Sequence, residues 1–196
     1  MVAISALVER WRAGDERAAE TLYHHFWDRI YWLCYGLLGD AGDAEEVAQD
    51  ALYYGLANIT RYDPDRSAFS TWLHTIAVSR CRNKRRRRRP QLVSLAAWLG
   101  VGRDVPDPAP NQERRLVRTE SQGEVWEAVQ TLSPRLREAI FLRYWAGHTY
   151  REMASILRCP VATAQSRVRL AYQRLRAILA PDILAALSDV EERIVR

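Results

Sequence analysis

The segment from Thr149 to Leu179 constrains the fold of this chain most, because it has the pattern of two short helices joined by a tight turn. Thr149 and Glu152 have the spacing of a capping box, which predicts a helix start. Proline is tolerated at a helix start and not inside one, so Pro160 predicts that a second helix begins there. In that helix, small and apolar residues recur at intervals of three and four, which predicts one buried stripe. The stripe comprises Val161, Ala164, Val168, Ala171, Leu175 and Ile178.

The remaining faces of this second helix are polar and basic. They carry Thr163, Gln165, Ser166, Arg167, Arg169, Gln173, Arg174 and Arg176. An ordinary amphipathic helix with a solvated charged face has the same periodicity. The short first helix, the tight turn and the charge balance favour DNA instead, since six Arg and one Glu lie between Thr149 and Ala180. The pattern therefore predicts a helix-turn-helix whose second helix suits a DNA major groove.

Composition narrows the function further. The chain has 196 residues, a net charge of +5 and a pI near 9.4, which favours a polyanionic partner. Cys34, Cys81 and Cys159 lie far apart and form no ligand cluster, so we expect no metal, no cofactor and no disulfide. The sequence has no Gly-rich phosphate loop and no nucleophile with a base at a telling spacing, so we expect neither enzymatic activity nor catalytic residues. Without a signal peptide or a membrane-length apolar run, a cytoplasmic protein with no membrane insertion is expected.

The rest of the chain reads as helical, with no convincing strand. In the first half we expect four helices: a short one from about Ser5 to Arg12, one ending at Gly39, one opening at Asp43, and one from Ser70 to Arg89. Alternating Pro106, Pro108 and Pro110 predict an extended linker, and a second helical domain follows it. The expected fold is all-α, with two small helical domains joined by a flexible linker. The boundaries are residues 1–90, linker 91–121, second domain 122–180 and a short tail 181–196.

Charge is segregated within the first domain. Residues 40–60 hold five acids and no Lys or Arg, whereas residues 61–90 hold ten bases and two acids. Carboxylates near a helix N-terminus also suit the helix dipole, and a basic helix end is often only solvated. Six consecutive bases from Lys84 to Arg89 are more than solubility requires, however, and favour contact with phosphate.

Together these segments resemble the extracytoplasmic-function (group IV) sigma factors of bacterial RNA polymerase. Asp43–Asp50 is similar to the acidic polymerase-binding segment of that family, and Phe69–Ala77 is similar to the helix that reads the −10 promoter element. Leu132–Arg143, Tyr150–Ala154 and Thr163–Arg167 resemble the family's fourth conserved region. The order of the pieces and the linker between them carry the resemblance, which covers most of the chain.

The resemblance implies a promoter-specificity factor that binds core RNA polymerase at the beta-prime clamp and the beta flap, binds promoter DNA, and is held by an anti-sigma factor. It implies that the polymerase clamp is contacted by Asp43, Glu45, Glu46, Gln49 and Asp50. It implies that the −10 element is bound, with one base flipped out of the strand, by Tyr62, Asp63, Phe69, Ser79, Arg80, Asn83, Lys84, Arg85 and Arg86. It implies that the −35 element is read by Thr163, Gln165, Ser166, Arg167 and Arg169.

Two other functions remain open at this level. An ordinary helix-turn-helix regulator would bind duplex DNA without polymerase, usually as a dimer. A sigma-like decoy would bind an anti-sigma factor and never touch DNA.

The chain also departs from the family pattern. Ser79, Asn83 and Arg158 stand where the family commonly has Asn, Asp and Gly. Trp126 and Trp145 are interpreted as packing residues. The four histidines are interpreted as structural or surface groups, namely His24, His25, His74 and His148.

Overall fold

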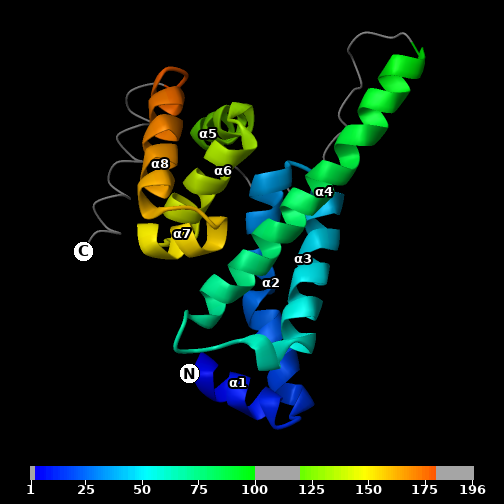
Figure 1. The fold of residues 1–196 in the computed structure, drawn as a ribbon, viewed down its shortest axis with the longest axis vertical. Helices are drawn as coiled ribbons and strands as arrows, with labels where there is room; N and C mark the ends of the chain where they lie inside the picture. Colours follow the sequence, from blue (N-terminus) through cyan, green and yellow to red (C-terminus); the bar gives the residue numbers. More distant parts are fainter. Residues whose placement is uncertain (1–2, 100–119, 180–196) are drawn as a thin grey trace.

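The computed structural model describes the backbone of residues 3–99 and 120–179 and the side chains of residues 3–88 and 123–179. Within those ranges every regular element is helical, which confirms the predicted all-α class (Figure 1). An N-terminal unit contains α1 (Ile4–Arg12), α2 (Glu16–Leu38), α3 (Ala41–Ala57), the 3-10 turn η1 (Ile59–Arg61) and α4 (Phe69–Leu99). A C-terminal unit contains α5 (Glu120–Thr131), α6 (Pro134–Ile140), the π-helical turn η3 (Phe141–Trp145), α7 (Tyr150–Leu157) and α8 (Val161–Arg176). The centre of the predicted linker and the predicted tail lie outside the described residues.

Two caps fix the hairpin between α2 and α3. Gly39 adopts a left-handed conformation with φ +78°, which ends α2 where the sequence predicts. Asp40 then caps α3 by accepting the backbone N–H of Asp43 at 2.7 Å. The prediction that this helix opens at Asp43 is therefore wrong by one turn, because Asp40 supplies the cap. Asp43 lies in the first turn, where the helix dipole favours a carboxylate.

Helix α2 supplies the centre of the N-terminal core. Its apolar residues recur at helical spacing and form one buried face, since Leu22, Phe26, Ile30, Leu33 and Leu37 are each at most 2% exposed. This face packs against α3 and α4, and α1 covers its N-terminal half. Burying a Leu, Ile or Phe side chain contributes about 1.5–3 kcal/mol, so this face is a main source of stability.

Helix α4 is longer than the sequence predicts. We expected it to stop at Arg89, yet it continues through Pro90 to Leu99 and so runs into the segment assigned to the linker. Proline inside a helix removes one backbone hydrogen bond and costs about 3 kcal/mol, which is why the sequence favours a stop there. The residues on both sides are mostly Arg, Leu and Ala, all strong helix formers, and they carry the helix past the missing bond.

The predicted helix-turn-helix is confirmed in detail. The side chain of Thr149 accepts the N–H of Glu152, whose carboxylate accepts the N–H of Thr149 in return, so the capping box is complete. Helix α8 begins directly after Pro160. Arg158 ends α7 in the left-handed conformation with φ 53° and ψ 55°, at the position where Gly is common.

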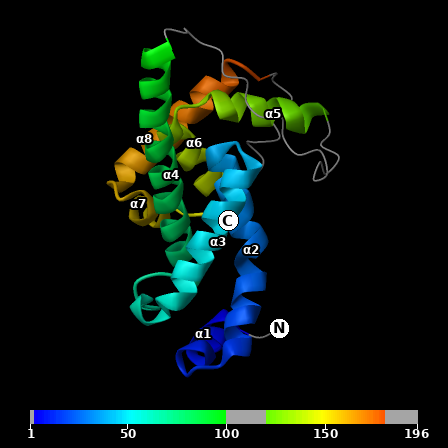
Figure 2. The same cartoon turned by 90° about the vertical axis from the view of Figure 1, so that its right-hand side faces the viewer.

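The two units pack directly on one another, which the sequence did not show. Helix α7 contacts α4, and α6 and η3 contact α2 (Figures 1 and 2). The N-terminal core continues into the C-terminal unit through Ala139, Leu142, Met153, Ile156, Leu157, Ala164 and Val168. A second, smaller apolar cluster lies between α5, α6 and α8. The larger core is thus shared by both units.

Candidate nucleic-acid interface

The acidic segment of α3 faces the basic segment of α4. Asp43 is only 8% exposed, and its carboxylate lies 3.4 Å from Nζ of Lys84 and 2.7 Å from Nη2 of Arg88. Two further ion pairs cross the same gap, Glu46 with Lys84 at 2.5 Å and Asp50 with Arg80 at 3.1 Å. The hydrogen bond from Lys84 to Glu46 raises the pKa of that ammonium. The two charged patches of the sequence are therefore neighbours that partly neutralise one another.

The predicted docking residues differ in their availability to a partner. Glu45 and Gln49 are exposed, and the side chains of Glu46 and Asp50 are each 63% exposed. Exposed ion pairs contribute only about 0–1 kcal/mol, so a basic partner can replace the α4 cations at little cost. Asp43 instead holds α3 against α4 and is enclosed by their side chains.

The loop between η1 and α4 is anchored by an aromatic cluster. Tyr62 and Phe69 are 8% and 4% exposed, with ring centroids 5.1 Å apart. The hydroxyl of Tyr62 donates to the backbone oxygen of Ser67 at 3.1 Å, and burial raises its pKa. Tyr62 and Phe69, both predicted to contact a DNA base, therefore lie in the core, where they hold the loop against the helices beneath it. Asp63 is exposed and accepts the N–H of Asp65 at 3.0 Å.

Helix α4 divides its polar residues among three faces. One face turns to α3 and carries Arg80, Lys84 and Arg88. A second turns to α6, where Arg82 and Arg85 both pair with Glu138. A third is exposed and carries Ser79, Asn83, Arg86 and Arg87. Of the residues predicted to bind the −10 element on this helix, Ser79, Asn83 and Arg86 are the ones that are exposed and form no ion pair within the described part of the chain.

Helix α8 carries its predicted DNA-contacting residues on the faces that lie away from its buried stripe. Its buried stripe is confirmed for Ala164, Val168, Ala171 and Leu175, whereas Val161 and Ile178 at its ends are 41% and 57% exposed. Gln165, Ser166 and Arg169 are exposed, and Thr163 and Arg167 are half-buried. Neither Arg167 nor Arg169 forms an ion pair with any residue in the described ranges, so both guanidiniums are available to an anionic partner.

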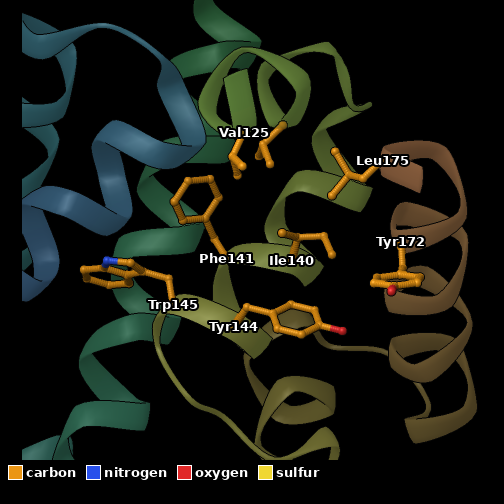
Figure 3. Close-up of a pocket in the computed structure, with 8 residues that line it drawn as sticks. Val125, Ile140, Phe141, Tyr144, Trp145, Tyr172 and Leu175 are labelled. Atoms are coloured by element: carbon orange, nitrogen blue, oxygen red, sulfur yellow. The ribbon is translucent and has the colours of Figure 1, made fainter. Parts of the chain in front are cut away.

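An apolar groove opens on the C-terminal unit, on a surface that sequence reasoning missed. It holds a cavity of about 240 Å³, and Ile140 and Tyr144 face Tyr172 and Leu175 of α8 across it (Figure 3). The complete lining is Val125, Val129, Ile140, Phe141, Tyr144, Trp145, Tyr172 and Leu175. Trp145, expected as a packing residue, is 43% exposed at this groove. An exposed Trp beside apolar residues suits a contact with another protein.

Three buried polar residues were also missed by sequence reasoning. Glu138, His74 and His148 are 1%, 4% and 4% exposed, and each meets a partner in the other unit. The histidines were interpreted as structural or surface groups, and no sequence signal links residues that lie 74 positions apart. A Glu inside the apolar pattern of α6 was the one available hint.

The described residues offer no metal site, since no three His, Cys, Asp or Glu side chains gather in a suitable cluster among them. None of the described helices has both the length and the apolar character needed to cross a membrane.

Comparison with known proteins identifies the two units. The family model for Sigma-70 region 2 matches residues 22–91, and the model for Sigma-70, region 4 matches residues 122–175. The chain is 32% identical over 180 residues to the RNA polymerase sigma-H factor of Pseudomonas aeruginosa, covering 89% of this chain and 93% of that protein. It is 28% identical over 178 residues to the ECF RNA polymerase sigma factor SigW of Bacillus subtilis, covering 88% and 95%.

Solved structures agree with this assignment. The sigma factor RpoE of Bartonella quintana, in complex with the anti-sigma factor NepR, superposes with a TM-score of 0.67 at 25% identity, covering 83% of this chain and 97% of that one. CnrH, in complex with the cytosolic domain of CnrY, has the same fold with a TM-score of 0.63 at 20% identity, covering 88% and 94%. Two matched regions in the expected order, an exposed basic helix-turn-helix and relatives of similar length establish that this chain belongs to the sigma-70 family, among the extracytoplasmic-function sigma factors that direct RNA polymerase to promoters.

Proposed function

We propose that this sigma factor uses two surfaces to bind core RNA polymerase and two others to read the promoter. The exposed acids of α3, led by Glu45, bind the beta-prime clamp, and the apolar groove beside Trp145 receives an apolar segment of the beta flap. Residues 1–90 and 122–180 are the two functional units of this assignment. RNA synthesis remains with the polymerase, and we assign no catalytic step, cofactor or metal to this chain, which acts in the cytoplasm.

For the promoter, we assign the −10 element to the loop that follows Tyr62 and to the exposed face of α4 with Ser79, Asn83 and Arg86. We assign the −35 element to α8, with Arg167 and Arg169 on guanine or phosphate. The single observation that carries the function is the order of two matched regions along one chain, each with an exposed polar face on a rigid helix. An ordinary helix-turn-helix regulator needs no region 2, so the match over residues 22–91 argues against it.

An anti-sigma factor is the expected regulatory partner. RpoE was solved in complex with the anti-sigma factor NepR, and CnrH was solved in complex with the cytosolic domain of CnrY. Both proteins share the fold of this chain. We propose that an anti-sigma factor also binds this sigma factor.

Reconstituted transcription tests the proposal. Core RNA polymerase, with and without this protein, is supplied with fragmented DNA from its own genome, and the transcript starts are sequenced. Discrete starts that need both components support the proposal and reveal the promoter sequence. Duplex binding by the protein alone, without starts, would support a helix-turn-helix regulator, and the absence of both would support a decoy. Glu45→Gln should weaken polymerase binding, whereas Glu20→Gln, an exposed acid on α2, is the matched control.

A further inference from the structure

A buried carboxylate joins the two units. Glu138 of α6 is 1% exposed and lies between two arginines of α4. Arg82 donates to it from Nε at 3.1 Å and from Nη2 at 2.6 Å, and Arg85 pairs with its other oxygen. The hydrogen bond to Glu138 raises the pKa of Arg82. A carboxylate this deeply buried needs its cationic partners, so α6 and α4 are held together here.

A glycine and an aromatic ring form a second close contact between the units. A Cβ added at Gly36 of α2 would lie 2.2 Å from Cε1 of Phe141 and 2.6 Å from its Cδ1. Beside this contact, Gln130 donates to the backbone oxygen of Gly36 at 3.1 Å, and the ring of Tyr35 stacks on Trp126 at 4.6 Å. The units can approach this closely only because residue 36 has no side chain.

A histidine pair forms the third contact. Nδ1 of His74 on α4 lies 2.6 Å from Nε2 of His148, which precedes α7. One ring must donate and the other accept at this distance, so two protonated rings would place two N–H groups against each other. Burial, together with the neighbouring His148, lowers the pKa of His74 to about 3, and burial lowers the pKa of His148. The contact therefore requires at least one neutral ring.

The charges around this pair come from every element packed against it. Arg29 of α2 adds positive charge near His74. Arg143 of η3 donates to the backbone oxygen of His148 at 3.1 Å. Among the described residues, Glu152 of α7 supplies the carboxylate beside the pair, 3.6 Å from Nδ1 of His148, and it also accepts from Thr71 of α4 at 3.2 Å. One carboxylate faces two arginines, so the site does not favour additional protons.

This arrangement is too compact for a promoter. Helix α4 contacts α7, and α7 contacts α8. Packed helices lie 8–10 Å apart, so α8 is within about 20 Å of α4. The −10 and −35 elements are about 25 base pairs apart, which is roughly 85 Å of duplex. The closed chain cannot reach both elements at once.

We propose that the closed arrangement is a self-inhibited state of the free sigma factor, latched by Glu138 on Arg82 and Arg85 and opened when the His74–His148 pair takes up protons. In this state the −10-reading face of α4 and the −35-reading helix α8 stay exposed, but they are held too close together to engage both promoter elements at once. The inhibitory consequence rests on the proposed function, whereas the closed conformation does not. Polymerase must therefore capture the open form or displace the latch.

The pH dependence follows from the direction of the pKa shifts. In the open state both rings return toward the ordinary histidine value of 6.5. Above that pH the histidine rings are neutral in both the closed and the open state, so the free-energy difference that favours the closed state is at its largest. As pH falls below 6.5, the open form takes up protons that the closed form excludes. The ratio of closed to open chains then falls by up to about tenfold per pH unit for each excluded proton.

The test is energy transfer between two dyes on the full-length chain, one on each unit. Dyes are placed at Tyr53→Cys on α3 and Leu170→Cys on α8, both exposed positions, in a Cys159→Ser background. The wild-type interface should give one high-transfer population at pH 8 that decreases at pH 5.5. Low transfer at pH 8, or transfer that does not change with pH, would overturn the proposal.

Two variants should open the closed form, each by disrupting a different contact between the units. Gly36→Ala should give low transfer at both pH values, because its Cβ collides with Phe141. Glu138→Gln should do the same by removing the charge between Arg82 and Arg85. Gly123→Ala is the matched control, since a Cβ there meets no atom within 4 Å, and it should behave as the wild type. High transfer in both opening variants would overturn the latch.

Histidine variants isolate the proton step. His148→Gln should remove most of the pH dependence, whereas His24→Gln, at an exposed position of α2, should leave it intact. If the open form is a tenth of the free chain or less, Gly36→Ala should bind core polymerase at least about tenfold more tightly at pH 8. Normal energy transfer without any transcription would reject the proposed function and leave the closed conformation standing.

Discussion

The carboxylate of Asp43 lies 2.7 Å from the guanidinium of Arg88 across the contact between α3 and α4, whereas Glu45, two residues further along, faces solvent. Neighbouring acids of one sequence motif therefore have different roles. One holds two helices of the fold together, and the other is free to meet a basic surface of the polymerase.

Substitutions at these two acids should separate stability from binding. Asp43→Asn should lower the free energy of unfolding by about 1–2 kcal/mol, because it leaves Arg88 and Lys84 without their shared carboxylate. Glu45→Gln should leave the melting temperature unchanged and weaken binding to core polymerase. Thermal unfolding and a polymerase-binding titration measure both. An Asp43→Asn variant of normal stability but weakened binding would show that Asp43 is a contact residue instead.

The left-handed residue Arg158 carries conformational strain. A non-glycine residue at this φ costs roughly 1 kcal/mol, so Arg158→Gly should stabilise the chain by up to that amount. For a chain of this length, 1 kcal/mol raises the melting temperature by about 2–4 °C. Calorimetry measures the shift. Arg151→Gly, inside α7, is the contrasting variant and should destabilise by about 1 kcal/mol. Equal changes in melting temperature for Arg158→Gly and Arg151→Gly would contradict the presence of conformational strain at Arg158.

Arg167 and Arg169 of α8 should differ in what they bind on the DNA. A guanidinium that bonds guanine contributes about 1–3 kcal/mol at one base position, whereas one on phosphate contributes equally for all sequences. Arg167→Ala and Arg169→Ala should therefore be measured by transcription from −35 variants at several salt concentrations. Loss of phosphate contact reduces the salt slope by about one. Arg10→Ala, whose side chain pairs with Asp15 far from α8, is the control. Full activity of both α8 variants would remove this helix from the interface.

The apolar groove should tolerate a charge in the free chain and not in the complex. Trp145→Asp should cost about 2 kcal/mol or more of affinity for the flap, because an exposed Trp in an apolar lining is a typical anchor of protein contacts. Ile178→Asp, at an exposed apolar residue outside the groove, should change affinity little. Pull-down with the isolated flap segment compares the two. Equal binding by both variants would exclude the groove as the docking site.

Acidification should destabilise the folded chain in two stages. The folded pKa of His74 is lowered to about 3 from 6.5, so its contribution is complete above pH 6.5 and is lost as pH falls toward 3. Each such histidine costs up to about 1.4 kcal/mol per pH unit. Partial burial acts to raise the pKa of Glu152, but hydrogen bonds from Thr149 outweigh it and keep the pKa below 4.5. Its contribution is present above pH 4.5 and lost below it. Urea unfolding from pH 8 to pH 3.5 measures both stages, and a flat profile between pH 7 and 5 would contradict the first.

Residues close in sequence carried most of what could be predicted. The capping box of Thr149 and Glu152, the stop at Gly39 and the start after Pro160 each depend on groups within a few positions of one another. The acidic cap of α3 was placed one turn late, because Asp40 and Asp43 fit the same rule equally well. The predicted end of α4 was wrong, because the rule against proline inside a helix does not take into account the strong helix formers on both sides of Pro90. The predicted contact residues of α8 lie off its buried stripe, and their roles on DNA stay predictions.

The sequence by itself determined which segments are helical, where most of them begin and end, and that the chain has a sigma region at each end. Those properties follow from side chains that act on their own backbone or on the next turn. Only the tertiary structure decided that Glu138 lies between Arg82 and Arg85, that Phe141 covers Gly36, and that two histidines 74 positions apart touch. Such contacts depend on how the apolar surfaces of the two units pack against each other. No local sequence pattern indicates which helix an apolar surface will pack against.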